Sequence, residues 1–180
     1  MRKVLIVVDM QNDFITGALG SAEAQAIVPN VVEKVKNWDG ELLFTRDTHY
    51  ESYMNTLEGQ KLPVPHCIYN TSGWDIIDEL RQYVKHSYDI IDKRTFGYEG
   101  WRHEILDRYA NDINSLNELD ITLIGVCTDI CVVSNALALR MFYPNTKITV
   151  DASCCAGVTP EKHAAALEVM KSCQIEVINE

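Results

Sequence analysis

Two cysteines lie four residues apart in the stretch GVCTDICVVSN, residues 125–135. Cys127 and Cys131 allow three interpretations: one is a nucleophile, both bind a metal ion, or both are small core side chains. The chain has six cysteines but no CxxC pair, so a structural zinc ribbon is not expected. The choice between the other interpretations depends on the chemistry that the rest of the chain brings to these thiols.

Charged and nucleophilic side chains follow four separate apolar runs of the sequence. They are Asp9, then Asp47 with His49, then Lys93, and finally Cys131. Each of them alone has an ordinary explanation, as a turn residue, a surface charge or a small core side chain. If the runs are parallel strands, however, their carboxyl ends lie at one edge of the sheet, where ligands bind in such folds. The convergence of these groups at that edge favours a catalytic site.

The apolar runs are nearly continuous, as in strands that are buried on both faces of a parallel sheet. Six of them lie at residues 3–9, 41–47, 88–92, 120–126, 147–152 and 174–179. Helical patterns lie between them, at residues 22–37, 73–85, 101–110, 129–142 and 160–172. This alternation predicts an α/β fold with a doubly wound, mostly parallel six-stranded sheet and helices on both faces. We expect one domain over residues 1–180, in which the irregular stretch 50–72 is a functional loop.

The composition limits the classes of partner. The formal net charge is −10 and the pI is about 4.9, which argues against binding to nucleic acid or to an anionic membrane. The first apolar run, residues 4–8, is too short for a signal peptide or a membrane span. We therefore expect a cytoplasmic protein with reduced cysteines and a small-molecule substrate.

Cys131 is the stronger candidate for a nucleophile. It lies in the first turn of the helix expected after GVCTD, which Thr128 or Asp129 could cap. The free N–H groups and the positive end of the helix dipole favour a thiolate there, and Lys93 would favour it further. Asp9 could accept the thiol proton. A core cysteine, the alternative, fits poorly beside charged groups.

Cys127 has a different expected role, because it lies at the end of a strand, before the turn. Its backbone N–H can point into the site, while its side chain forms a small wall of the pocket. No metal ion is then expected between the two thiols. The remaining cysteines are expected to be core or loop thiols: Cys67, Cys154, Cys155 and Cys173.

A set of candidate metal ligands lies in RDTHYESYMNTLEGQKLPVPHC, residues 46–67: Asp47, His49, Glu58 and His66. Asp47 and His49 are two apart in extended chain, so their side chains leave on the same side. The loop that follows can bring the other two back to them. Two imidazoles and one or two carboxylates suit one divalent ion, with zinc expected first and manganese or iron(II) as alternatives. An ordinary polar loop is the competing interpretation.

Together these motifs resemble those of the isochorismatase-like cysteine hydrolases. The resemblance lies in VVDMQNDF, DKRTF and GVCTDICV, in the family's order, and the metal-ligand stretch resembles that of the nicotinamidase and pyrazinamidase branch. It implies a catalytic triad of Asp9, Lys93 and Cys131. It also implies a cis peptide between Val126 and Cys127, and an oxyanion hole formed by the backbone N–H groups of Cys127 and Cys131.

For function, the resemblance implies an amidase that converts nicotinamide to nicotinate and ammonia through a thioester. In nicotinamidases the pyridine nitrogen binds the metal, and here Phe14 and Phe96 would sandwich the ring. Family members are often dimers or larger, so a homo-oligomer is expected. Residues 50–55 lack the additional histidine of many pyrazinamidase-type members, and Glu58 resembles the glutamate that replaces it in another branch. Pro63 stands where some members carry tryptophan, so the substrate wall differs here.

Three other interpretations compete with this one. An isochorismatase-like amidase for carbamoyl or ureido compounds would use the triad without a metal. A nucleotide-binding module would use the turn TGALGSA, residues 16–22, but this stretch matches neither GxGxxG nor GxxxxGKS/T. We expect it to be a flexible connection. A non-catalytic scaffold that has only kept the fold is disfavoured by the complete triad.

Overall fold

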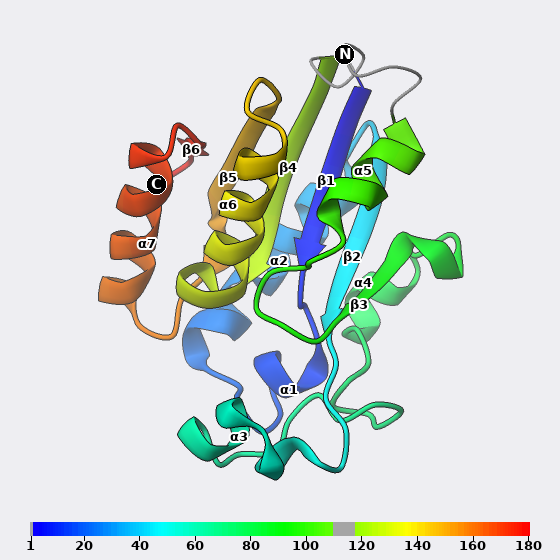
Figure 1. Cartoon of the computed structure of the whole chain (residues 1–180), viewed down its shortest axis with the longest axis vertical. Helices are drawn as coiled ribbons and strands as arrows, with labels where there is room; N and C mark the ends of the chain where they lie inside the picture. Colours follow the sequence, from blue (N-terminus) through cyan, green and yellow to red (C-terminus); the bar gives the residue numbers. More distant parts are fainter. Residues whose placement is uncertain (1, 110–117) are drawn as a thin grey trace.

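The computed structural model describes residues 2–109 and 118–180, and its centre is a parallel sheet (Figure 1). The six strands of this described part are β1 (Arg2–Val8), β2 (Glu41–Asp47), β3 (Ile90–Lys93), β4 (Leu119–Val126), β5 (Lys147–Ala156) and β6 (Glu176–Ile178). They lie in the order β3-β2-β1-β4-β5-β6, and every registered pair is parallel. The chain starts with β1 in the middle of the sheet, adds β2 and β3 on one side of it, and then returns to add β4, β5 and β6 on the other side. The predicted doubly wound sheet is confirmed.

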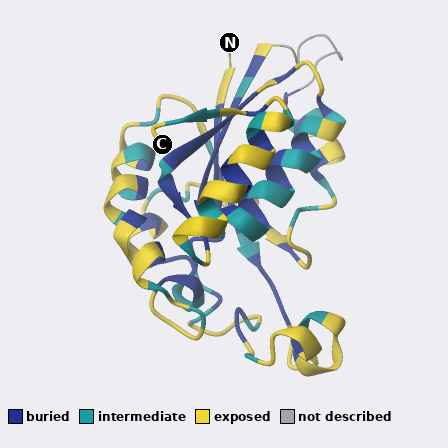
Figure 2. Ribbon diagram, turned by 90° about the vertical axis from the view of Figure 1, so that its left-hand side faces the viewer, coloured by how far each residue is buried: buried dark blue, intermediate teal, exposed yellow. Residues whose placement is uncertain are grey.

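Helices cover both faces of the sheet. On one face lies α2 (Ala22–Lys36), and on the other lie α5 (Trp101–Tyr109), α6 (Val133–Phe142) and α7 (Pro160–Ser172). The residues of β1 alternate between the two cores: Val4, Ile6 and Val8 pack with α5 to α7, and Leu5 and Val7 pack with α2. Figure 2 shows the strands buried between helices whose outer surfaces are exposed. This double burial explains why the strands read as continuous apolar runs.

The segment 73–85, predicted as one helix, consists mostly of turns, and within it only α4 (Asp78–Arg81) is helical. Its first part instead pairs with the stretch after β1, where the N–H of Ile77 donates to the carbonyl of Met10. Such long-range bonds take the backbone groups that a helix would need, which is why the prediction was wrong. The same pairing supports the short helix α1 (Asn12–Ile15), which the sequence did not predict.

The stretch 50–72, predicted as an irregular loop, contains a 3-10 turn (Tyr53–Asn55) and the short helix α3 (Leu57–Lys61). The predicted helix after β4 begins as a π-helical turn (Thr128–Val132) and continues as α6. Within the described ranges, the structure has no helix that is both long and apolar enough to cross a membrane.

Candidate active site

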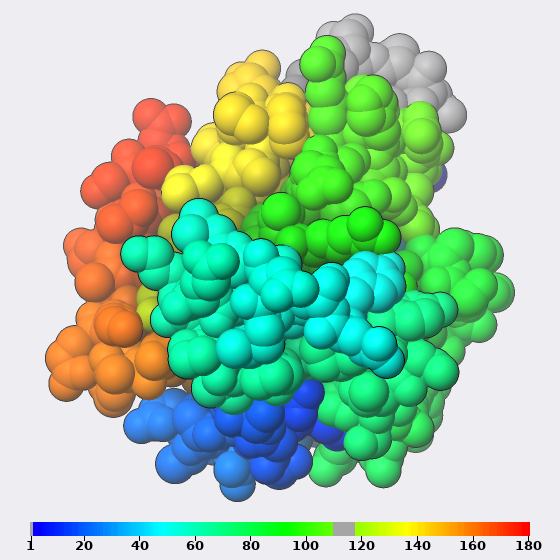
Figure 3. Space-filling view, turned by 60° about the horizontal axis from the view of Figure 1, so that its bottom comes forward, coloured from blue at the N-terminus to red at the C-terminus, as the bar shows by residue number. Residues whose placement is uncertain are grey.

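A cavity of about 340 Å³ lies beyond the carboxyl ends of the central strands, where the strand order reverses. Open parallel α/β sheets bind their ligands in this position. The predicted site residues on its lining are Phe14, Asp47, Glu58, His66, Phe96, Cys127 and Cys131. The lining also includes apolar side chains that the sequence did not single out: Leu19, Ala24, Leu62 and Val158. In Figure 3, where this end faces the viewer, the segment around residues 50–70 spreads across it.

The three residues of the predicted triad come together beside this cavity. Lys93 lies between the other two: its Nζ is 2.7 Å from Asp9 Oδ2 and 3.6 Å from Cys131 Sγ. Each residue is at most 5 % exposed. Asp9 follows β1, Lys93 ends β3, and Cys131 lies in the π-helical turn after β4. This arrangement can move a proton from the thiol to the carboxylate beside a fixed positive charge.

Asp9 is also held by the neighbouring strand, through a residue that the sequence analysis missed. The hydroxyl of Thr45 donates to Asp9 Oδ1 at 2.6 Å, and the backbone N–H of Asp9 donates to the Thr45 carbonyl at 3.2 Å. The available signal was a lone hydroxyl in the apolar strand ELLFTRD. The hydroxyl orients the carboxylate and stabilises its ionised form.

Burial dominates the protonation of the triad. It raises the pKa of the Cys131 thiol and of the Asp9 carboxyl, while the neighbouring Lys93 ammonium opposes both shifts. Burial alone would lower the pKa of Lys93, but the negative charges of Asp9, Cys131 and Asp47 raise it. As expected, the Lys93 charge favours the thiolate, but burial outweighs this effect and keeps the pKa of the thiol raised. The structure favours a protonated thiol close to a carboxylate that can take its proton.

The π-helical turn that carries Cys131 is not capped by either of the predicted side chains, Thr128 or Asp129. The Thr128 hydroxyl shares a hydrogen bond with His163 Nδ1 at 2.8 Å, and Asp129 Oδ1 accepts from the N–H of Val158 at 2.9 Å. No described side chain caps this helix start. Both residues instead tie the turn to α7 and to the loop before it, so tertiary contacts fix the position of Cys131.

The four candidate metal ligands come together beside this cavity, and all but His49 line it: Asp47, His49, Glu58 and His66 have ligand atoms within 4.8 Å of one another. His49 Nε2 is 3.0 Å from Asp47 Oδ2 and 3.5 Å from Glu58 Oε1, and His66 Nε2 is 3.6 Å from Asp47 Oδ2. Ligands at about 2.1 Å from one ion are separated by about 3.0–3.5 Å, so the set fits one divalent ion. His66 Nδ1 donates to the Val64 carbonyl at 2.8 Å, which leaves Nε2 free as a ligand.

The carboxylates of this cluster, Asp47 and Glu58, favour positive charge among the four side chains. Burial alone would lower the pKa of His49, but Asp47 and Glu58 raise it to about 9. Burial acts to raise the pKa of Asp47, yet hydrogen bonds from both histidines and the charge of Lys93 hold it below its usual range. Asp47 presents Oδ2 to the histidines and Oδ1 to Lys93 Nζ, which is 3.4 Å away. One carboxylate therefore joins the metal-ligand cluster to the triad.

The backbone at the end of β4, just before the turn that carries Cys131, has two special features. The peptide between Val126 and Cys127 is cis, as the resemblance implied. Gly125 has a φ of 116°, and a Cβ added there would clash with the carbonyl oxygen of Val8 on the neighbouring strand. Only glycine suits this position, because the two backbones approach closely.

The two aromatic residues expected to hold a substrate ring both line the cavity. Phe14 is buried, and its ring centroid is 5.5 Å from that of His66. Phe96 is 46 % exposed, which places it at the mouth of the cavity. The cavity therefore has an aromatic side chain beside the candidate metal ligands and another at its entrance.

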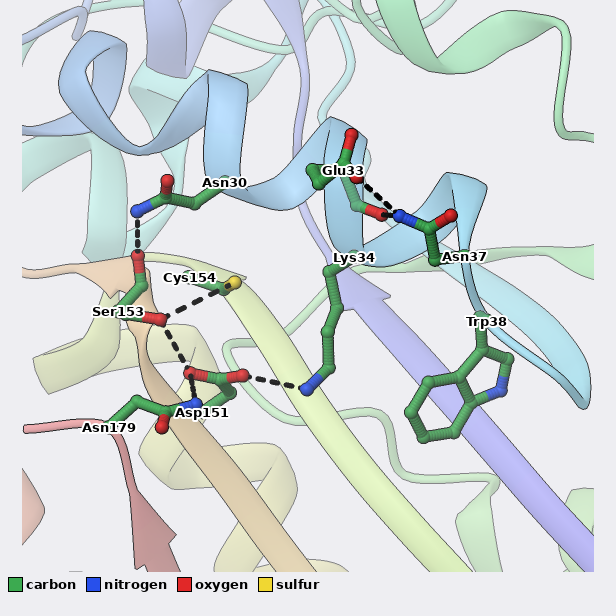
Figure 4. A pocket seen from close by; sticks show the side chains of 9 residues that line it. All are labelled: Asn30, Glu33, Lys34, Asn37, Trp38, Asp151, Ser153, Cys154 and Asn179. Carbon is green, nitrogen blue, oxygen red and sulfur yellow. Dashed lines mark hydrogen bonds and ion pairs between the residues drawn. The ribbon is translucent and has the colours of Figure 1, made fainter.

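A second cavity, of about 460 Å³, lies between α2 and β5 (Figure 4). Its central group is Asp151, whose carboxylate accepts hydrogen bonds from Lys34 Nζ at 2.8 Å, Ser153 Oγ at 2.8 Å and Asn179 Nδ2 at 3.1 Å. These side chains point toward one another and satisfy each other's polar atoms. They hold α2, β5 and the chain beyond β6 together, so we assign this cluster a structural role.

A buried thiol, amine and carboxylate therefore lie together at the switch point of a parallel α/β sheet, an arrangement suited to a hydrolase. By sequence, the chain belongs to the isochorismatase domain family, whose family model matches residues 3–180. Among its relatives is the nicotinamidase of Schizosaccharomyces pombe, which is 27 % identical over 98 % of this chain and 92 % of its own length.

Solved structures agree with this assignment. The pyrazinamidase/nicotinamidase of Streptococcus mutans superposes with a TM-score of 0.80 at 29 % identity, covering 98 % of this chain and 99 % of its own. The pyrazinamidase of Pyrococcus horikoshii in complex with zinc superposes with a TM-score of 0.77 at 26 % identity and covers 100 % of both chains. These matches confirm the fold and the predicted nicotinamidase branch of the family.

Proposed function

We propose that this protein is a metal-dependent amidohydrolase that converts nicotinamide to nicotinate and ammonia. The observation that carries the proposal is that Cys131 and three of the four candidate metal ligands line one cavity, with Asp47 linking that cluster to Lys93. A pyridine carboxamide offers one group to each part: its carbonyl carbon to the thiol and its ring nitrogen to a metal. The activities named for the relatives support the same substrate class.

The chemistry begins with the protonated thiol. Asp9 takes the proton of Cys131, and the thiolate attacks the carboxamide carbon while Lys93 stabilises both negative charges. The charge that develops on oxygen is stabilised by the backbone N–H groups of Cys127 and Cys131. Such donors are worth about 3 kcal/mol each.

The same carboxyl group then completes the cycle. Asp9 gives its proton to the leaving nitrogen, the C–N bond breaks, and ammonia leaves a thioester on Cys131. Asp9, ionised again, removes a proton from the water that attacks the thioester. Cleavage of the C–S bond releases nicotinate, and Asp9 returns its proton to the sulfur, which restores the thiol.

Asp47, His49, Glu58 and His66 would hold one divalent ion. When bound, the ion supplies a Lewis acid that orients the substrate through its ring nitrogen. We expect zinc first, because two imidazoles with two carboxylates suit it and the Pyrococcus horikoshii relative is a zinc complex, with manganese or iron(II) as alternatives. Phe14 would pack against the ring beside these ligands.

Phe96 would close over the other face of the ring at the mouth of the cavity.

The competing function is an amidase for carbamoyl or ureido compounds, which would use the triad alone. The four candidate metal ligands distinguish the two functions, since these convergent side chains have no role in the competing reaction.

Ammonia release tests the proposal. The zinc-loaded protein is assayed with nicotinamide, pyrazinamide and a carbamoyl amide, before and after chelation. We expect release from nicotinamide that disappears on chelation and returns with zinc. Turnover of the carbamoyl amide alone, unchanged by chelation, would identify the competing amidase.

A homo-oligomeric assembly and a cytoplasmic location are part of the same proposal. We expect a homo-oligomer because members of the family are often dimers or larger. We expect a cytoplasmic location because six free thiols fit a reducing compartment. Light scattering coupled to gel filtration measures the oligomeric state directly, and a monomeric mass would contradict the first expectation.

A further inference from the structure

Gln11 is a fully buried amide just beyond the end of β1. Its Oε1 accepts from the backbone N–H of Asp47 at 2.7 Å, and its Nε2 donates to the backbone carbonyl of Asp47 at 2.9 Å. The registered pairing of β1 with β2 ends at Val7 and Phe44, before the chain reaches Asp47. Beyond that point, the side chain of Gln11 takes the place of a paired strand.

Asp47 is thereby held from both sides. In the sheet it pairs with Lys93 of β3, and on its other side the amide of Gln11 bonds to both of its backbone polar groups. Its carboxylate depends on this position, because Oδ2 lies 3.0 Å from His49 Nε2 while Oδ1 lies 3.4 Å from Lys93 Nζ. A displaced backbone would move the carboxylate away from one of these partners.

A further contact fixes Gln11 itself. Its Nε2 also donates to the carbonyl of Trp74 at 2.8 Å, and Trp74 Nε1 donates to the hydroxyl of Thr48 at 2.8 Å. The Arg46 guanidinium lies 3.4 Å from the centre of the Trp74 ring. The segment around Trp74 thus contacts the residues on both sides of Asp47 and anchors the amide that holds it.

We infer that Gln11 is a positioning residue for the metal centre. It fixes the backbone of Asp47 so that one carboxylate can serve the metal and Lys93 together. Among the described residues, the side-chain amide of Gln11 bonds only to backbone atoms of Asp47 and Trp74, so the effect of this amide on the metal passes through Asp47. The inference rests on the proposed function in one respect, namely that Asp47 is a metal ligand.

The test compares two fully buried amides. Gln11→Met removes all three hydrogen bonds at similar volume. Asn135→Leu is the matched control, because the Asn135 amide accepts from Trp101 Nε1 at 2.7 Å and donates to the Cys131 carbonyl at 2.8 Å, away from the metal ligands. Zinc affinity of the full chain is measured by competition with a coloured chelator. Outer partners of metal ligands change affinity by about 10–100-fold, and we expect such a loss for Gln11→Met but less than about twofold for Asn135→Leu.

The outcomes separate the explanations. A merely structural role would lower the melting temperatures of both variants and leave their zinc affinities alike, which would overturn the inference. If Gln11→Met does not fold, Gln11→Glu decides, since it keeps the shape and the accepting oxygen but loses at least one N–H donor: weaker zinc binding supports the inference, and wild-type binding overturns it. A wild-type chain that binds no zinc would overturn the metal centre itself, and this inference with it.

Discussion

Replacing Thr45 with valine keeps the shape of the side chain but removes the hydroxyl, which donates to the carboxylate of Asp9, the proposed base, and accepts from the Asp9 backbone N–H. The hydroxyl donates at 2.6 Å to a carboxylate that is 0 % exposed, so bulk water cannot replace it. The bond stabilises the ionised form of Asp9, and its loss therefore raises the pKa of this carboxyl above its already raised position. A hydrogen bond to a charged group contributes about 1.5–3 kcal/mol, and a tenfold change corresponds to about 1.4 kcal/mol.

The consequence is a displaced pH profile. Asp9 must be ionised to take the thiol proton, so activity falls as the pH drops through its pKa. For Thr45→Val, we expect the acid limb of kcat/KM for nicotinamide to move to higher pH by about 1–2 pH units. The measurement is kcat/KM from pH 4 to 9, with the zinc content checked at each pH.

Two further variants make this result specific. Thr45→Ser keeps the hydroxyl and should retain the wild-type acid limb. Thr122→Val replaces another buried threonine, on β4, and should also leave the limb in place. An acid limb of Thr45→Val that superimposes on that of the wild type would refute Asp9 as the base or the hydrogen bond as its support.

Three more expectations follow from the described contacts. Cys131→Ala should abolish turnover while its zinc content, measured by atomic absorption, stays at the wild-type level; residual turnover would contradict the covalent route. Glu58→Gln should weaken zinc binding about tenfold or more, whereas Glu51→Gln in the same segment should bind zinc as the wild type does. Asp151→Asn should lower the free energy of unfolding by about 1–3 kcal/mol at pH 7. Although burial acts to raise the pKa of Asp151, Lys34 and its neighbouring hydrogen bonds lower it from 3.8, so this stability is present above that pH and is lost on further acidification. Urea unfolding should therefore show a smaller difference between the two proteins at pH 3 than at pH 7.

The strands and their chemistry could be predicted because one physical pattern encodes both. Continuous apolar runs mark parallel strands, and polar residues at their ends mark the binding edge. Asp9 and Lys93 were found in this way, and the structure places them 2.7 Å apart. Asp47 and His49 were paired by the two-residue period of extended chain.

The remaining features depend on contacts between distant segments. The segment 73–85 has a helical pattern, but its backbone bonds to the stretch after β1 prevent a helix there. Gln11 gave no signal as a polar residue in a loop, since its partners lie more than thirty residues away. Local charge alone could not show the complete burial that raises the pKa of Cys131 against the Lys93 charge, because this burial arises only in the folded protein.

Gly125 has a consequence for mutational tolerance. Any side chain there would meet the carbonyl oxygen of Val8, so every substitution must push β1 away from β4 and with them the segments that carry Asp9 and Cys131. In a saturation library scored separately for cellular abundance and for activity, position 125 should lose both together. Position 131 should keep abundance and lose activity. The comparison of these two positions, six residues apart, would separate the requirement for a close backbone approach from the requirement for a nucleophile.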